Sequence, residues 1–337
     1  MCKVSFITSV YNCEEFIEET IKSVINQTFV DWEYILIDDC SKDKSVDKIK
    51  SFKDSRIKLI ENTNNRGQSN NLNYGISIAK GDFIARLDHD DLCYPERTTR
   101  QLEYMERNPD VDLCGCKNDV WCDGKYSEIA FPPIHTPAEV KYSLTLGINV
   151  LAHSSFFIRK ESLIRHNIGY GNYRYAEDLD LLFKILRFGK VGFVDETLIS
   201  YRIFPNQFTQ TCGNELIESE ITEIRNKYFN DTNLKYDIIL KKALFNKGVR
   251  TIDEYKNLEL ACIDYAINCG IDGDTVLENS IVRYMFKILF LEQGYYPTTI
   301  IAYMSSKLLS KRWLVSVNGV KFIIACLLCY NNVGGVS

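Results

Sequence analysis

Three aspartates, Asp88, Asp90 and Asp91, follow directly on an apolar run in the segment FIARLDHDD. Like charges in such a place repel one another and resist burial unless a cation, or a ligand that carries one, lies among them. Carboxylate oxygens suit Mg²⁺ and Mn²⁺, and these ions often bind a substrate diphosphate as well. The spacing of Asp88 and Asp90 therefore predicts a Mn²⁺ or Mg²⁺ site, with His89 as a spacer. The alternative is a solvated acidic loop ahead of the next helix.

A second acidic pair, Glu177 and Asp178, begins the segment EDLDLLFKIL, whose apolar spacing predicts a helix. Acidic residues are common in the first turn of a helix because the helix dipole favours them there. A carboxylate in this position can also serve as a general base toward a hydroxyl group. His153 also has two interpretations. It could line the side of the site where the group that accepts a transferred moiety would bind, or it could be a histidine of the core.

The residues before the aspartates alternate between strand and helix patterns. Apolar, β-branched runs predict strands over residues 3–10, 33–39, 56–61 and 82–88. Helical spacing begins at Glu14 and again at Gly67, Pro95 opens a third helix, and a strand followed by a helix is expected over 153–163. This order predicts an α/β fold with a mostly parallel central sheet flanked by helices.

Polar side chains follow each of these strands at the carboxyl end. In such sheets ligands bind beyond the carboxyl ends of the strands, so these residues are expected at one edge. They are Thr8, Ser9, Tyr11, Asn12, Asp38, Asp39, Asn64, Asn65 and Arg66, together with the three aspartates.

The composition restricts the class of protein. The 337 residues are 45% hydrophobic, which is enough for a sizeable core, and a net charge of -5 argues against a general nucleic-acid binder. The 12 cysteines are too dilute for a disulfide scaffold and are expected as reduced thiols. No signal peptide or apolar run long enough to span a membrane is evident, so a cytoplasmic location is expected.

The motifs, taken in order, resemble those of the family 2 glycosyltransferases, which have the GT-A fold. VSFITSVYNCEEF, SVINQTF and LIDDCSKD match the opening of that family, and GISIAKGDFIARLDHDD continues it. AEDLDL looks like its E-D motif and YRIFPNQFT like its Y-R segment. The resemblance covers roughly residues 3–210. In one departure, Cys40 stands where the family often has glycine, which matters if the turn needs a positive φ.

The resemblance implies an inverting glycosyltransferase of surface polysaccharide or glycoconjugate synthesis. It would move a sugar from a nucleotide-sugar, UDP-linked by family analogy, to a hydroxyl of a glycan or lipid-linked acceptor. The residue roles that it implies are as follows: Thr8, Tyr11, Asn12 and Glu14 around the base and ribose, Asp39 as acceptor of a hydrogen bond from the base, Arg66 close to the same pocket, Asp88 at the ribose or metal, Asp90 as main metal ligand, Asp178 as catalytic base and Arg202 at the diphosphate.

Two regions are expected: a catalytic domain over residues 1–210, with a nucleotide half at 1–92 and an acceptor half at 93–210, and a helical extension over 211–337. Phe322–Tyr330 and nearby basic residues could form a cap, an oligomer contact or a peripheral contact with the inner face of the cytoplasmic membrane.

Two other functions are weighed. A nucleotidyltransferase usually has a glycine-rich basic loop after its first strand, whereas this chain has TSVYNCEEF. A non-catalytic nucleotide-binding module would not need a base at Asp178.

Overall fold

The fold is that of a computed structural model. It describes residues 2–122, 125–128, 134, 136–146, 149, 151–205, 207, 214–231, 249, 251–276, 278–279, 282–283, 302, 306 and 308–309. The chain divides into two compact units, one of residues 1–131 and 149–228, the other of residues 132–148 and 229–337. The predicted division between residues 210 and 211 stays a prediction.

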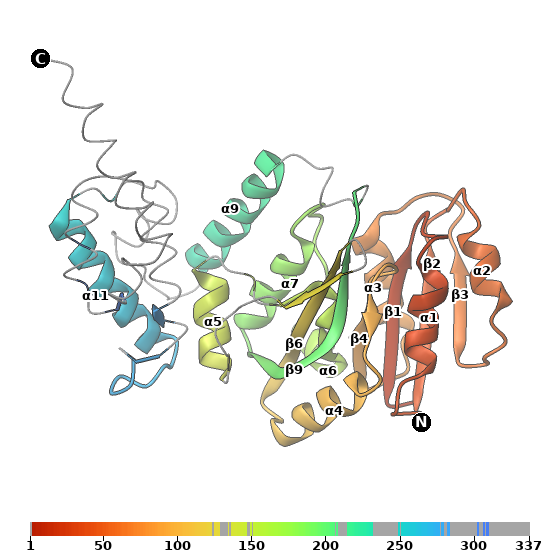
Figure 1. The fold of residues 1–337 in the computed structure, drawn as a ribbon, viewed down its shortest axis with the longest axis horizontal. Coiled ribbons are helices and arrows are strands. Elements are labelled where there is room, and N and C mark those ends of the chain that lie inside the picture. The colour runs from red at the N-terminus through yellow and green to blue at the C-terminus, as the bar shows by residue number, and fades with distance from the viewer. Residues whose placement is uncertain are drawn as a thin grey trace, which may run out of the picture. The chain divides into compact units, whose positions relative to one another are not determined.

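The first unit contains one mixed sheet (Figure 1). The strands hydrogen-bond in the order β3-β2-β1-β4-β8-β6-β9-β5, and β7 pairs with β6. The first four strands in chain order pair parallel with one another, as predicted, whereas β8 pairs antiparallel with β4, β5 with β9 and β7 with β6. The strands are β1 (Val4–Val10), β2 (Trp32–Asp38), β3 (Ile57–Glu61), β4 (Phe83–Arg86), β5 (Leu92–Cys93), β6 (Val111–Cys122), β7 (Lys125–Glu128), β8 (Phe157–Arg159) and β9 (Lys190–Ile203).

Helices cover both faces of the parallel part of the sheet, which confirms the predicted α/β class. Alternate residues of β1 and β2 pack against apolar side chains of α1 (Ile17–Ile25), α2 (Ser45–Ser51) and α4 (Arg97–Arg107). On the opposite face, α3 (Gln68–Ile78) approaches so closely that a Cβ on Gly75 would lie 2.6 Å from Ile7 Cγ2. The close approach explains a glycine inside this helix. The third helix was predicted to open at Pro95. It begins at Arg97 with Glu96 as its N-cap, so Pro95 lies just before the helix.

The strand register places the expected ligand edge. Val10 at the end of β1 lies opposite Asp38 of β2, which in turn lies opposite Glu61 of β3. β4 ends earlier, with Arg86 beside Ile7, so the segment that follows it turns across the last residues of β1. The four carboxyl ends therefore meet at one edge, as the sequence predicts.

The sequence does not predict the long pair β6 and β9. Their residues mix polar and apolar types, and the register shifts between them at two places near Lys117. The remaining elements of this unit are η1 (His153–Ser155), α6 (Lys160–Arg165), α7 (Glu177–Leu186) and α9 (Asn214–Asp231), and the unit ends within α9, at Tyr228.

In the second unit the structure describes α5 (Pro137–Thr145) and α11 (Ile252–Asn268). Each begins with a capping box, at Thr136 and Thr251, and the Tyr142 and Tyr265 rings lie 6.1 Å apart. Among the described residues, no helix is long and apolar enough to cross a membrane. The predicted cap or membrane segment, Phe322–Tyr330, lies outside the described residues.

Candidate active site

Hydrogen bonds to its backbone carbonyls anchor the segment between β4 and β5. The buried Thr8 hydroxyl donates to the Leu87 carbonyl at 2.7 Å. The Thr20 hydroxyl of α1 lies 2.9 Å from the His89 carbonyl and 3.0 Å from the Asp91 carbonyl. His89 turns its Nδ1 to a β1 carbonyl, 3.1 Å away, which fits its predicted role as a spacer. The loop is thereby fixed against β1 and α1.

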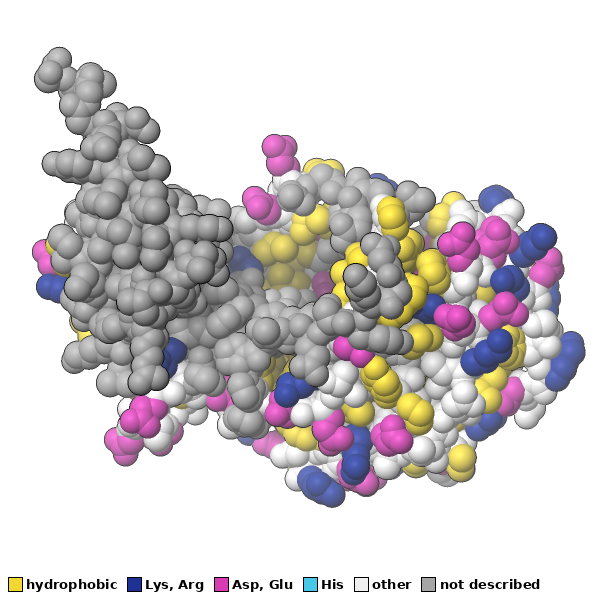
Figure 2. Space-filling model, viewed as in Figure 1, with side chains coloured by type: hydrophobic (Ala, Val, Ile, Leu, Met, Phe, Trp, Pro, Cys, Tyr) yellow, Lys and Arg dark blue, Asp and Glu magenta, His cyan; other side chains and the backbone are white. Residues whose placement is uncertain are grey.

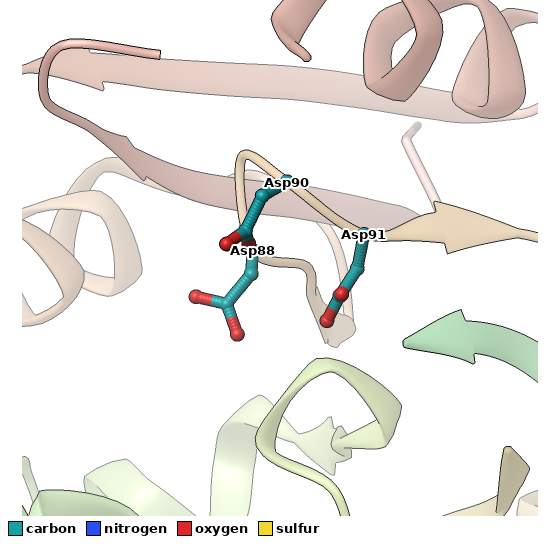
Figure 3. A group of neighbouring side chains, drawn as sticks. All are labelled: Asp88, Asp90 and Asp91. Atoms are coloured by element: carbon teal, nitrogen blue, oxygen red, sulfur yellow. The ribbon is translucent and has the colours of Figure 1, made fainter. Parts of the chain in front are cut away.

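Asp88, Asp90 and Asp91 lie together on this loop. One carboxylate oxygen from each lies within 4.8 Å of the other two. Figure 3 shows the three side chains leaving the same loop, with the carboxyl groups of Asp88 and Asp91 directed toward the same side. Three carboxylates this close are stable only if their charges are compensated, and the structure compensates two of them.

Asp88 is compensated by Arg86, the last residue of β4. The guanidinium has only 3% of its side chain exposed and donates from Nη1 and Nη2 to the two carboxylate oxygens. Burial alone would raise the pKa of Asp88, but the charge and hydrogen bonds of Arg86 hold it well below its ordinary value. The Ser154 hydroxyl adds a hydrogen bond of 3.0 Å. Asp88 is therefore ionised and paired.

Asp91 is completely buried and receives hydrogen bonds from two distant segments. The Ser154 hydroxyl donates to Oδ2, and the backbone N–H of Arg202 donates to Oδ1 at 3.0 Å. Burial, followed by the charges of Asp90 and Asp88, raises the pKa of Asp91 well above its ordinary value. This carboxyl is a structural member of the cluster, and the sequence assigned it no role.

Asp90 differs from both neighbours. Its residue is 8% exposed, and within the described part of the chain no other residue donates a hydrogen bond to its carboxylate. Burial raises the pKa of Asp90, and the nearby Asp88 charge adds to the effect. Asp90 therefore keeps carboxylate lone pairs that a bound cation could use.

The cluster fits a divalent cation. Its donors are carboxylate oxygens, which hard cations prefer, and among the three carboxylates Arg86 pairs with Asp88 alone. Asp90 is the oxygen donor with free capacity, whereas Asp88 already shares both oxygens with Arg86. The prediction that Asp90 is the main ligand stays a prediction with this support, and Asp88 could contribute only the lone pairs that Arg86 leaves.

The residues predicted at the base and ribose lie at the carboxyl ends of β1 and β2. Thr8 is fully buried, bonded to Leu87 and to Tyr34, while Tyr11 is 45% exposed. Asn12 Oδ1 accepts from the Lys42 N–H at 2.8 Å, and Glu14 Oε2 accepts from the Lys44 N–H at 2.9 Å. The exposed ring of Tyr11 is thus available to a ligand, whereas Asn12 and Glu14 brace the loop after β2.

Asp39 organises the start of α3. Its carboxylate accepts from the N–H groups of Arg66, at 2.7 Å, and Gly67, at 2.9 Å. Asn62 donates to it as well, at 3.1 Å, and the residue is 2% exposed. A hydrogen bond from a nucleotide base would have to share this carboxylate with these donors. The Arg66 side chain itself is exposed beside it.

The turn after Asp39 does require a positive φ. Cys40 has φ 67°, in the left-handed region where a β-carbon is disfavoured. The departure from the family pattern therefore places a residue with a β-carbon at a position that favours glycine.

Arg202, in β9, is buried under the loop. Its Nη1 lies 2.6 Å from Glu19 Oε2, and its Nε donates to the Asp90 carbonyl. Only 5% of the side chain is exposed. In this structure the guanidinium binds the backbone of the aspartate loop. Its contact with a diphosphate stays a prediction.

Asp178, the second residue of α7, is half-buried. Its Oδ1 accepts from the Leu179 N–H at 2.7 Å and its Oδ2 from Asn149 Nδ2 at 3.2 Å. Burial raises its pKa, and among the other influences the Arg86 charge lowers it while the Asp88 charge raises it. Asp178 therefore lies within electrostatic reach of the aspartate loop.

Glu177, directly before Asp178, is half-buried as well. Burial and the Asp178 charge raise the pKa of Glu177 to about 8. Its Oε1 accepts a hydrogen bond of 2.9 Å from Gln68 and lies 3.9 Å from His153 Nδ1. Burial and the Arg86 charge hold the pKa of His153 well below its ordinary value, so that contact is not an ion pair at neutral pH. His153 also bonds the Tyr170 hydroxyl, at 2.8 Å.

Sequence reasoning missed Arg86, Ser154 and Gln68. Arg86 left one signal, because it is the only charged residue inside the apolar run FIAR. Ser154 is adjacent to His153 in η1, and through it the turn that faces Glu177 also binds Asp88 and Asp91. For Ser154 and Gln68, no local sequence pattern predicts a hydrogen bond to a residue so distant in the chain.

Charge on the visible surface is mixed. On the face that Figure 2 shows, Lys and Arg side chains are interspersed with Asp and Glu rather than gathered by sign.

Comparison with known sequences identifies relatives along most of the chain. The family described as Glycosyl transferase family 2 matches residues 5–166. The putative glycosyltransferase EpsE of Bacillus subtilis (strain 168) is 33% identical over 227 residues, which are 65% of this chain and 80% of that protein.

Solved structures share the fold. S. aureus TarS 1-349 in complex with UDP-GlcNAc gives a TM-score of 0.58 at 13% identity, over 98% of this chain and 92% of that one. The mannosyltransferase PcManGT from Pyrobaculum calidifontis, in complex with GDP-Man and Mn²⁺, gives 0.50 at 15% identity, over 97% and 86%. At these identities the likeness concerns the fold alone.

Proposed function

The chain belongs to glycosyltransferase family 2, and we propose that it transfers a sugar from a UDP-sugar to a hydroxyl group of a glycan or lipid-linked acceptor, with inversion and with a divalent cation. The observation that carries the proposal is the division of labour in the aspartate loop. Asp88 is paired with Arg86 and Asp91 is hydrogen-bonded by Ser154 and the Arg202 backbone, whereas Asp90, at the ligand edge of the sheet, receives no hydrogen bond from another described residue.

The donor side is supported by residue types and by relatives of the same fold. The exposed ring of Tyr11, the exposed Arg66 and the carboxylate of Asp39 follow β1, β3 and β2 at one edge. TarS binds UDP-GlcNAc, and PcManGT binds GDP-Man with Mn²⁺, which supports a nucleotide-sugar and a divalent cation for this chain. A guanine nucleotide in place of UDP is the alternative that a donor screen would reveal.

Asp90, with Asp88 beside it, would hold the cation. A divalent ion there would supply neutralisation of the diphosphate charge, which makes the nucleotide a good leaving group. Arg86 keeps Asp88 ionised and in place, and the backbone N–H of Arg202 holds the Asp91 carboxyl by a hydrogen bond. The loop is therefore built before any ligand arrives.

Asp178 would act as the base. The acceptor hydroxyl gives its proton to Asp178 while its oxygen forms the new bond to the anomeric carbon, and the bond to the diphosphate breaks on the opposite face. One base and one displacement invert the anomeric centre. Asn149 and the Leu179 N–H each bond one Asp178 oxygen and so fix its orientation, and its raised pKa favours proton transfer near neutral pH.

The test is a screen of UDP- and GDP-sugars, with and without Mn²⁺, on the wild type, Asp178→Asn and Asp90→Ala. Asp178→Asn should lower kcat by about 10²- to 10⁴-fold, because the amide cannot take the proton. Its Kd for UDP with Mn²⁺ should change by less than about fivefold, or roughly 1 kcal/mol. Asp90→Ala should lose Mn²⁺-dependent UDP binding while remaining folded.

The matched control is Asp253→Asn, which changes an exposed acidic residue in the first turn of α11 and should leave transfer unchanged. Near-normal kcat in Asp178→Asn would show that the acidic pair is only a helix start. The base would then be sought among its neighbours, beginning with His153.

A further inference from the structure

The helix turn that carries Asp178 is tied to the nucleotide side by one side chain. Gln68, the first residue of α3, donates from Nε2 to Oε1 of Glu177 at 2.9 Å. Glu177 is the first residue of α7 and precedes Asp178 directly. The two partners are 109 residues apart in the sequence, so the bond joins two separately built parts of the first unit.

The start of α3 is fixed by the residue predicted to meet the nucleotide base. Asp39 accepts from the N–H groups of Arg66 and Gly67, and Gly67 is the N-cap of α3 with φ 82°. Gln68 follows these two groups immediately. A chain of contacts therefore runs from Asp39 through the first turn of α3 to Glu177.

Gln68 has no substitute among the described residues. A second α3 residue, Asn73, exchanges two hydrogen bonds with the backbone of Tyr170, at 2.8 and 2.9 Å, but these hold the segment ahead of α7. His153 stays 3.9 Å from Glu177, beyond a hydrogen bond. In the described part of the chain, Gln68 supplies the one side-chain hydrogen bond that Glu177 receives.

We propose that Gln68 is a positioning residue for glycosyl transfer, acting through Glu177 to fix the orientation of Asp178 relative to the nucleotide side. The inference rests on the proposed function, because it takes Asp178 as the base. Gln68 is not among the residues assigned to the base, ribose, diphosphate or metal, and among the described residues its side chain bonds Glu177. Its loss should therefore lower kcat and leave nucleotide affinity unchanged.

The experiment compares Gln68→Leu, Gln68→Glu and the exchanged pair Gln68→Glu/Glu177→Gln in the full chain. Gln68→Leu removes the donor, and Gln68→Glu, assayed at about pH 9, above the pKa of about 8 of Glu177, sets two ionised carboxyl groups against each other. Each should lower kcat by about 10- to 100-fold, which is the usual effect of a displaced catalytic group. The Kd for UDP with Mn²⁺ should stay within about twofold of wild type.

The exchanged pair separates positioning from simple loss of structure. It places the amide and the carboxyl at opposite ends of the same bond and keeps the total charge, so kcat should return to within about threefold of wild type. Ser69→Ala is the matched control. It alters the next residue of the same turn, whose side chain makes no recorded hydrogen bond among the described residues, and should change nothing.

Amide hydrogen exchange without ligand gives a readout that needs no activity. Residues 176–182 should exchange faster in Gln68→Leu and Gln68→Glu and return to the wild-type rate in the exchanged pair, while β1 and β2 stay protected in all variants. A wild type that transfers no sugar would refute the proposed function. Hydrogen exchange would then still test whether the bond between Gln68 and Glu177 stabilises the start of α7. Unchanged exchange in Gln68→Leu, faster exchange with normal kcat, or an exchanged pair as slow as Gln68→Glu would each overturn the positioning role.

Discussion

Replacing Arg86 by methionine should destabilise the first unit, even though Arg86 lies beside the proposed metal ligands. The guanidinium is 3% exposed and bonds both oxygens of Asp88. Arg86→Met would leave Asp88 unpaired beside Asp90 and Asp91. Removing one partner of a buried ion pair costs about 3–5 kcal/mol. Asp88 keeps 23% of its side chain exposed, so water offsets part of the cost and we expect about 3 kcal/mol.

The free energy of unfolding would be measured by urea titration in the presence of a chelator. Tryptophan fluorescence suits the measurement because Trp32 and Trp121 both lie in the first unit. Asp88→Asn, which leaves Arg86 unpaired, should cost a similar amount. The double variant Arg86→Met/Asp88→Asn should recover most of the loss, because neither charge then remains without its partner.

An exposed ion pair provides the control. Lys190 and Asp110 lie 2.5 Å apart with 56% and 59% of their side chains exposed, so Lys190→Met should cost less than about 1 kcal/mol. Mn²⁺ should stabilise Arg86→Met more than the wild type, because the variant has lost the positive charge nearest the three carboxylates. The reasoning would be refuted by an Arg86→Met protein within about 1 kcal/mol of wild type without metal, or by a double variant no more stable than Arg86→Met.

Two further variants test the turn after Asp39 and the first turn of α7. Cys40→Gly should raise stability by a few tenths to about 1 kcal/mol, because relief of the strain at φ 67° exceeds the added freedom of the unfolded chain. Cys40→Val should lower stability. Both changes would be measured by thermal unfolding, and a glycine variant less stable than wild type would contradict the prediction. Glu177 has a pKa of about 8 in the folded protein and an ordinary value of 4.5, so the unfolded chain releases this proton first and the wild type should lose stability as pH rises from about 4.5 to 8. Glu177→Gln lacks this loss, so its melting temperature relative to wild type should increase between pH 5 and 8, and a constant difference would contradict the raised pKa.

The sequence predicted the parallel half of the sheet because local patterns determine it. Buried parallel strands read as apolar runs, and each such run ended in polar residues that the register then aligned, as with Val10, Asp38 and Glu61. The long pair β6 and β9 could not be predicted in this way. Polar residues interrupt both strands, and their pairing joins segments about 80 residues apart, for which no local period exists.

The candidate site was predictable in its residue types and not in its partners. The acidic triplet, Asp39 and the Glu177–Asp178 pair all stand out in the sequence, because charge next to an apolar run is conspicuous. Ser154 and Gln68 do not stand out, since a hydroxyl or an amide is ordinary in any segment. Their importance comes from contacts across 63 to 109 residues, which only the folded chain reveals.

These distant partners change what the D-x-D pattern means in this chain. Read locally, Asp88 and Asp90 are two equivalent ligands. In the fold, Arg86 and Ser154 engage Asp88, while Ser154 and the backbone of Arg202 engage Asp91, and only Asp90 keeps its full capacity to bind. Because Ser154 and Arg202 come from η1 and β9, the loop acquires this asymmetry only when these elements have folded against it. The proposed cation site would therefore depend on the first unit as a whole, because a segment confined to β4 and the three aspartates would lack the donors that distinguish one carboxylate from the others.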